Sequence, residues 1–165
     1  MSNPNEFIKI PVNDEMIWKA INHKITIKEN AAKVGNQEIF KDEDSWQGFL
    51  CELAVEQWLG NLAVYDQPIT RADKYDFLMA GLKGDVKGSL LLNQSQYKKK
   101  VWINLYLFCQ YNPELKIVTV YGWQYRNEVN CHRLKKKNMK SPAYEIDWHD
   151  LRSPTSLHSN GSDMA

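Results

Sequence analysis

Apolar residues recur at the spacing of a helix near the start of the chain. Residues 13–34 carry Met16, Ile17, Ala20 and Ile21 at this spacing, before a polar stretch. An apolar stripe of this kind packs against the core of a globular protein. The pattern therefore predicts a helix over 13–34 whose role is packing.

A second helix is predicted over residues 45–59. Ser45 suits the N-cap position, and Gly60 suits the position after the last turn. Apolar residues surround most of this helix, which is typical of burial; they are Trp46, Phe49, Leu50, Cys51, Leu53, Ala54, Val55, Trp58 and Leu59. Glu52 and Glu56, one turn apart, are therefore unusual in such surroundings.

Long apolar runs later in the chain predict strands at 101–109 and 116–123, joined through residues 112–114. Their near-continuous apolar content indicates burial on both faces. We also expect a lysine-rich loop at 93–100, a short helix over 126–136, an edge strand over 143–147 and a disordered tail over 153–165. The whole chain is then one domain, 1–152, followed by that tail.

A β-hairpin is predicted between these parts, with strands at 73–80 and 83–92. Its turn is centred on Ala80-Gly81, where two residues connect the strands. Gly81 and Gly84 are expected to supply the backbone freedom that the turn or an adjacent bulge requires.

The turn position determines which side chains meet across the hairpin. It makes Asp76 the direct neighbour of Asp85, with Cβ atoms roughly 4.5–5.5 Å apart. Because side chains alternate along a strand, Lys87 points the same way as Asp85, and Val86 points to the opposite layer. Two facing carboxylates repel each other, and a bound divalent cation is the usual compensation.

Composition and charge narrow the class of protein. The chain has 165 residues, is 43% hydrophobic and 25% charged, and carries a net charge of only +1. Its residues 93–140, however, hold ten Lys or Arg against two Asp or Glu, a local excess of +8. This excess is typical of a surface that binds a polyanion such as DNA. For each cluster alone, a merely solvated surface is an equally good interpretation. The clusters are Lys98, Lys99 and Lys100, and Arg133, Lys135, Lys136, Lys137 and Lys140.

The three cysteines, Cys51, Cys109 and Cys131, show no C-x-x-C spacing. They suggest neither a disulfide framework nor a structural zinc site, and we expect them to be reduced. No histidine stands at motif spacing from Cys51, which argues against a cysteine nucleophile. The N-terminus lacks the features of a signal peptide, and no apolar run reaches the roughly 20 residues that span a bilayer. We therefore expect a cytoplasmic protein that does not bind membranes.

The order of these motifs resembles the PD-(D/E)xK nuclease superfamily, and within it the small phage-encoded members. The likeness covers roughly residues 45–150 and rests on Gly48-Phe-Leu-Cys-Glu52-Leu-Ala-Val-Glu-Gln-Trp58-Leu-Gly60, Asp76-Phe77, Asp85-Val-Lys87 and Val120-Tyr-Gly122-Trp123. It implies an α/β protein with a restriction-endonuclease-like core, which is a central mixed sheet of four to five strands flanked by helices. The proline expected before the first aspartate is absent, and Tyr75 stands there. The first metal ligand is therefore either Asp73 or Asp76, and the hairpin register favours Asp76.

The resemblance implies a catalytic site for phosphodiester hydrolysis. Asp76, Asp85 and Glu52, with the backbone carbonyl of Val86, would hold Mg²⁺, for which Mn²⁺ would substitute. Lys87 would orient or activate the attacking water. Glu56 is read as a solvated or supporting residue. The basic clusters, namely Lys98, Lys99 and Lys100 with Arg133, Lys135, Lys136 and Lys137, would bind DNA.

The function expected on this basis is that of a metal-dependent DNA endonuclease acting on double-stranded or branched DNA. If a phage encodes the protein, it would work in the host cytoplasm. The competing interpretation is a non-catalytic DNA-binding module of the same fold. An exonuclease or Holliday-junction resolvase also stays open, as does a homodimer, because no segment of the sequence indicates an interface.

Overall fold

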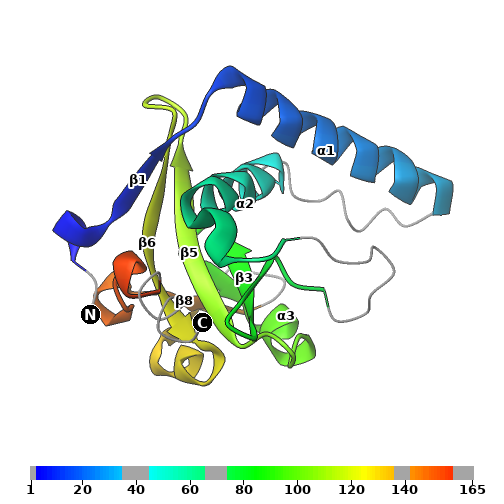
Figure 1. Ribbon diagram of the computed structural model, residues 1–165. Helices are drawn as coiled ribbons and strands as arrows, with labels where there is room; N and C mark the ends of the chain where they lie inside the picture. Colours follow the sequence, from blue (N-terminus) through cyan, green and yellow to red (C-terminus); the bar gives the residue numbers. More distant parts are fainter. Residues whose placement is uncertain (1–2, 35–44, 66–73, 136–141, 158–165) are drawn as a thin grey trace.

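A mixed five-stranded sheet forms the centre of the computed structural model, which describes residues 3–34, 45–65, 74–135 and 142–157 (Figure 1). The strands follow the order β1-β6-β5-β3-β2, and β3 and β5 are the parallel pair. Their bounds are β1 Ile8–Pro11, β2 Phe77–Met79, β3 Leu82–Lys87, β5 Leu105–Asn112 and β6 Ile117–Tyr125. The α/β class and the mixed, helix-flanked sheet that the sequence predicts are confirmed.

Two helices cover one face of this sheet (Figure 1). Helix α2, Ser45–Leu59, packs against β3 and β5, and α1, Asp14–Val34, packs on α2. The backbones of α2 and the segment after β3 approach very closely, because a Cβ built on Gly88 would lie 3.1 Å from Cα of Gly48. Gly60 follows α2 with φ +55°, a conformation that favours glycine, and begins the 3-10 turn η3, Gly60–Leu62.

The opposite face carries a smaller, second layer. It contains a three-stranded antiparallel sheet in the order β4-β8-β7 and several short helical segments. The elements are β4 Leu91–Asn93, α3 Gln94–Lys99, η4 Arg126–Cys131, β7 Arg133–Lys135, β8 Ala143–Glu145 and η5 Trp148–Asp150, while η1, Pro4–Glu6, precedes β1.

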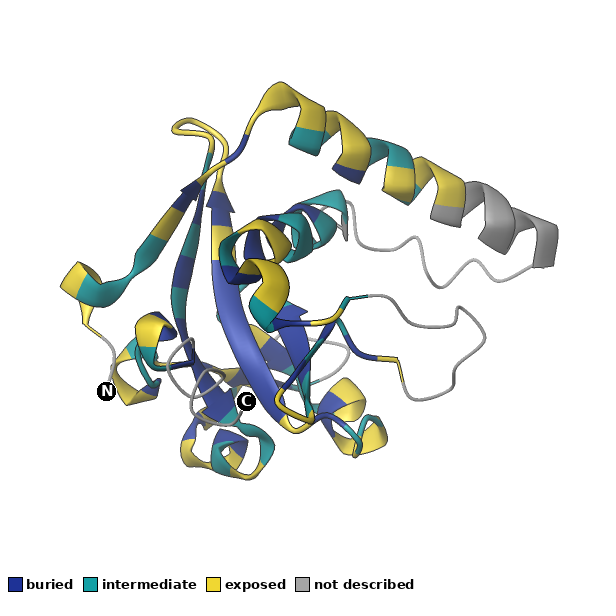
Figure 2. Ribbon diagram, viewed as in Figure 1, coloured by how far each residue is buried: buried dark blue, intermediate teal, exposed yellow. Residues whose placement is uncertain are grey.

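Strand β5 lies between two hydrophobic cores. Leu105 and Leu107 pack on the side of α2, whereas Tyr106 and Phe108 pack in the second layer. Four successive buried residues therefore alternate between the two cores, and Figure 2 shows β5 buried along most of its length. The predicted burial on both faces is confirmed for β5, whereas β6 alternates between half-buried and buried residues from Ile117 to Tyr121.

The hairpin turn is as predicted, but one of its glycines has another role. Met79 pairs with Leu82, and Ala80 and Gly81 between them have φ values of +51° and +79°. A positive φ at both turn residues fits a two-residue type I′ turn. Gly84, in contrast, is required by packing, because a Cβ there would lie 2.2 Å from the ring of Phe77.

Several boundaries differ from those predicted. Both long helices are confirmed, but the expected second hairpin strand ends at Lys87 and Leu91–Asn93 joins the other sheet. The expected loop 93–100 is largely helix α3, because the Asn93 side chain accepts a hydrogen bond from the Gln96 N–H and caps it.

For other elements, the sequence predicted the bounds or the type only in part. Strand β5 starts at Leu105 rather than 101, and the expected helix over 126–136 is a 3-10 turn followed by β7. The predicted edge strand near 143–147 is the central strand of its sheet. Strand β1 was missed, although Ile8, Ile10 and Val12 alternate as a strand requires.

The predicted tail begins too early. Trp123 pairs with Arg152, and its indole N–H donates to the Ser156 hydroxyl. Leu157 is only 2% exposed. Residues 153–157 therefore belong to the packed structure, and 158–165 lie outside the described residues. Among the residues described, no helix is both long and apolar enough to cross a membrane.

The Gly84 packing gives a first prediction. Gly84→Ala should lower the free energy of unfolding by about 1–3 kcal/mol, because the new methyl group meets the Phe77 ring. Gly48→Ala is the control, since nothing lies within 4 Å of its added methyl and alanine favours a helix by about 0.5–1 kcal/mol. Denaturant unfolding would contradict this account if both variants had equal stability.

Candidate active site at the open edge of strand β3

Strand β3 is paired on both edges only at Gly84. Strand β2 pairs with it from Leu82 to Gly84, while β5 pairs with it from Gly84 to Lys87. Beyond Gly84, the β2 side of β3 has no ladder partner among the described strands. Unpaired backbone groups and nearby side chains therefore meet at this open edge.

Asp76 closes the open edge with two hydrogen bonds. Its backbone N–H donates to the Gly84 carbonyl at 2.9 Å, and its Oδ2 accepts from the Val86 N–H at 2.7 Å. The two contacts bracket Asp85. The ladder ends at the pair Phe77–Gly84, which has the register predicted from the sequence, and Asp76 directly precedes that pair. The alternative ligand Asp73 lies outside the described residues.

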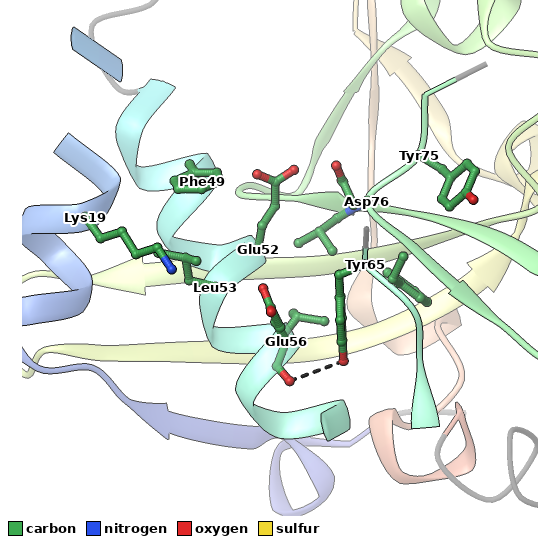
Figure 3. A pocket seen from close by; sticks show the side chains of 11 residues that line it. Lys19, Phe49, Glu52, Leu53, Glu56, Tyr65, Tyr75 and Asp76 are labelled. Atoms are coloured by element: carbon green, nitrogen blue, oxygen red, sulfur yellow. Dashed lines mark hydrogen bonds between the residues drawn. The ribbon is translucent and has the colours of Figure 1, made fainter. Parts of the chain in front are cut away.

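Glu52 approaches the same place from helix α2. Its carboxyl group lies close enough to that of Asp76 for each to shift the pKa of the other, and both residues line a cavity of about 360 Å³. Figure 3 shows Glu52 and Asp76 pointing into this cavity from different elements. The close approach of Gly48 to Gly88, one turn earlier on α2, positions Glu52 here.

The three neighbouring carboxyl groups have pKa values that are shifted in different directions. Burial raises the pKa of Asp76 well above its ordinary value, and the neighbouring Glu52 and Asp85 raise it further. Burial also raises the pKa of Glu52. Burial alone would raise the pKa of Asp85, but Lys87 and Lys100 lower it below its ordinary value. The surroundings therefore favour the protonated form of Asp76 and the ionised form of Asp85.

Asp85 is the most enclosed of these carboxylates, with an exposed fraction of 6%. The Lys87 ammonium lies 2.9 Å from its Oδ2, close enough for an ion pair. That oxygen still lacks a well-directed hydrogen bond. A buried carboxylate oxygen with unused acceptor capacity is costly, unless a further cationic or hydrogen-bonding partner is bound.

The donor set fits a hard divalent cation such as Mg²⁺. Asp76, Asp85 and Glu52 offer carboxylate oxygens, the ligands that Mg²⁺ prefers. Because the N–H and C=O of one strand residue leave on the same side, the Val86 carbonyl also faces the open edge where its N–H meets Asp76. Of the four groups predicted from the sequence, Glu52, Asp76 and Val86 line one cavity, and Asp85 is not among its lining residues but lies close enough to raise the pKa values of Glu52 and Asp76.

Helix α3 adds two residues to this site that were not foreseen there. The Lys87 ammonium is 3.4 Å from Oε1 of Gln96, at the outer limit of a hydrogen bond. Lys100, which caps α3, lowers the pKa values of Glu52 and Asp85 through its charge. The prediction of a loop at 93–100 did not bring Gln96 and Lys100 near the carboxyl groups, although Asn93 is a residue type that favours the N-cap position.

The two basic clusters stand on opposite edges of the small sheet. Lys98 and Lys99 are exposed on α3, which follows β4 directly, and Arg133 and Lys135 are exposed on β7. Asn93, Ala143 and Lys135 form one row across β4, β8 and β7, so their backbones span about 10 Å. Lys136, Lys137 and Lys140 lie outside the described residues.

Other residues considered from the sequence have different surroundings. Glu56 is exposed and lines the same cavity as Glu52 (Figure 3). Burial raises the pKa of the Cys51 thiol to about 12, which disfavours the nucleophilic thiolate. All three cysteines are free.

Comparison of the chain with protein-family models, curated proteins and solved structures finds no match. A function for this site therefore has to be argued from the geometry above and from the sequence motifs.

The raised pKa of Asp76 predicts how metal-free stability depends on pH. A raised folded-state pKa stabilises the protein at low pH, and this stability is lost as pH rises above about 4 towards the folded value. Asp76→Asn keeps an acceptor for the Val86 N–H and carries no charge. We expect it to raise the unfolding free energy at pH 8 by about 1 kcal/mol, with a smaller gain at pH 5.

Thermal unfolding in a chelator at both pH values measures this difference. Glu56→Gln is the matched control, because it removes an exposed carboxylate from the same cavity and should show little pH-dependent gain. An Asp76→Asn gain that did not grow with pH would contradict the assignment of the proton.

Proposed function

We propose that this protein is a Mg²⁺-dependent deoxyribonuclease, an endonuclease with a restriction-endonuclease-like core that acts in a cytoplasm. The observation that carries the proposal is the meeting of Glu52, Asp76 and Asp85 at the open edge of β3, with Lys87 beside them. Three neighbouring carboxyl groups cannot all ionise in a metal-free protein without repelling each other. A divalent cation offsets that cost.

The fold supports the proposal by placing the motifs on suitable elements. The first glutamate lies on a helix against the sheet, the first aspartate begins a hairpin, and Asp85-x-Lys87 lies on its second strand. This is the arrangement that the sequence resemblance implies. All four polar positions are present, whereas a non-catalytic module would have no need to keep them together.

The chemistry assigns a separate role to each residue. A bound Mg²⁺ shields the charge of a phosphodiester and promotes formation of hydroxide near neutral pH. Asp76 and Asp85, the Val86 carbonyl and Glu52 would hold that ion, with Asp76 giving up its proton on binding. The Lys87 ammonium can donate a hydrogen bond to the attacking water and offset charge that develops on the phosphate. Gln96 then limits the positions open to Lys87.

The proposed substrate is double-stranded or branched DNA. Lys100 stands close enough to influence the carboxylates, and Lys98 and Lys99 extend its positive charge along α3. Arg133 and Lys135 lie across the small sheet from them. A basic surface that contacts the phosphate backbone of DNA binds with little dependence on the DNA sequence.

Loss of one metal ligand tests the enzymatic proposal. Asp85→Asn should reduce Mg²⁺- or Mn²⁺-dependent plasmid cleavage by at least about 100-fold, because the ion and the charge at the phosphate are both affected. Glu52→Gln should raise the Mg²⁺ concentration needed for cleavage, whereas Glu56→Gln should change it little. Thermal unfolding confirms that each variant is folded.

The outcomes separate the competing functions. Full cleavage by folded Asp85→Asn protein would remove this site from consideration. DNA binding by the wild type without cleavage in either metal would favour a non-catalytic module. Linear, circular and four-way-junction substrates distinguish an exonuclease, an endonuclease and a junction resolvase.

The salt dependence of DNA binding tests the basic surface. Each lysine that contacts duplex phosphate contributes about 0.9 to the slope of log K against log salt. In the Asp85→Asn background, replacing Lys98 and Lys99 with alanine should reduce the magnitude of this slope by up to about 1.8. Lys100→Ala, made separately in wild-type protein, should also slow cleavage. Binding slopes that stayed unchanged would identify Lys98 and Lys99 as solvated surface.

A further inference from the structure

A second group of metal-ligating side chains lies in the smaller layer. Cys131 and His132 follow each other at the end of η4, and Asp150 ends η5. One ligand atom of each lies within 4.8 Å of the others. All three line a cavity of about 470 Å³, together with Glu145, Asp147 and Arg133.

Two hydrogen bonds fix the orientation of the His132 ring. Its Nε2 is 2.7 Å from Oε1 of Gln124, a side chain only 1% exposed, and its Nδ1 accepts the Asp147 N–H at 3.3 Å. Since Nδ1 accepts a hydrogen bond, the ring proton of neutral His132 resides on Nε2 and is donated to Gln124. Nδ1 thus keeps its lone pair on the side away from Gln124.

A buried carbonyl that receives the other ring N–H is the usual support of a metal-bound histidine. The Asp147 N–H contact at Nδ1 is long for a hydrogen bond, so a cation can replace it at small cost. Three carboxylates, Glu145, Asp147 and Asp150, outnumber Arg133 around the cavity, which also favours a cation.

We propose that Cys131, His132 and Asp150 form a binding site for Zn²⁺ or a similar first-row transition-metal ion. A thiolate, an imidazole and a carboxylate suit such an ion, whereas Mg²⁺ prefers oxygen ligands alone. The Cys131 thiol loses its proton to solvent on binding, and water completes a tetrahedral set. The ion would connect the ends of η4 and η5, two short elements with few backbone hydrogen bonds of their own. The sequence gives little sign of this site, because Asp150 stands 18 residues after His132.

Thiol reactivity of the whole protein tests the proposal. Cys131 is the exposed cysteine, while Cys51 and Cys109 are buried, so a thiol reagent added to the native protein reports on Cys131. Zn²⁺ at ten times its dissociation constant should slow this reaction about tenfold, and Mg²⁺ should not. Co²⁺ should give a thiolate-to-metal charge-transfer absorption that Cys131→Ser lacks.

Two further variants make the outcome decisive. Asp150→Asn changes an exposed side chain, so the fold is retained, and it should weaken Zn²⁺ protection of Cys131 at least about tenfold. Asp85→Asn, at the other site, should leave protection unchanged. Equal protection of wild type and Asp150→Asn would mean that Asp150 is not a ligand and would overturn the proposal. Absence of protection in the wild type would overturn it as well.

Discussion

The attachment of Asp76 to the open edge of β3 is the interaction on which the candidate active site depends. One residue satisfies backbone groups on both sides of Asp85, through its N–H to Gly84 and its carboxylate to Val86. An unpaired edge is ordinarily a liability in a sheet. Here a side chain replaces the missing ladder, and the replacement brings two carboxylates together at a defined separation.

The site joins two layers that have separate hydrophobic cores. Glu52 comes from the layer of α2, which Gly88 allows to approach closely, and Lys100 caps α3 in the other layer. Strand β5 packs in both cores and also pairs with β3, so it fixes the position of β3 relative to both layers. Changes far from the edge, such as a shift of α2 on the sheet, would therefore alter the distances between charges.

Local chemistry made the hairpin predictable, because a two-residue turn and alternating strand faces place Asp76 opposite Asp85 from sequence alone. The association of Asp85-x-Lys87 with Glu52 came from the resemblance, since it depends on tertiary packing. Helix α3 was missed because residues 93–100 were interpreted as a lysine-rich loop, although the Asn93 side chain caps a helix there. The role of Gly84 could not be foreseen, since it depends on where the Phe77 ring lies. Sequence patterns report local preferences, whereas these features depend on contacts between distant segments.

The charges at the edge explain why a metal and a phosphate would bind together. Under the proposed function, and with Asp76 protonated, the carboxylates of Glu52 and Asp85 balance the ammonium groups of Lys87 and Lys100 in formal charge. Replacing that proton with a divalent ion leaves one net positive charge. A phosphodiester carries one negative charge and would restore neutrality in a partly buried place, where uncompensated charge is costly. The lysines therefore make the metal-loaded site attractive to a phosphate, and the carboxylates alone would not.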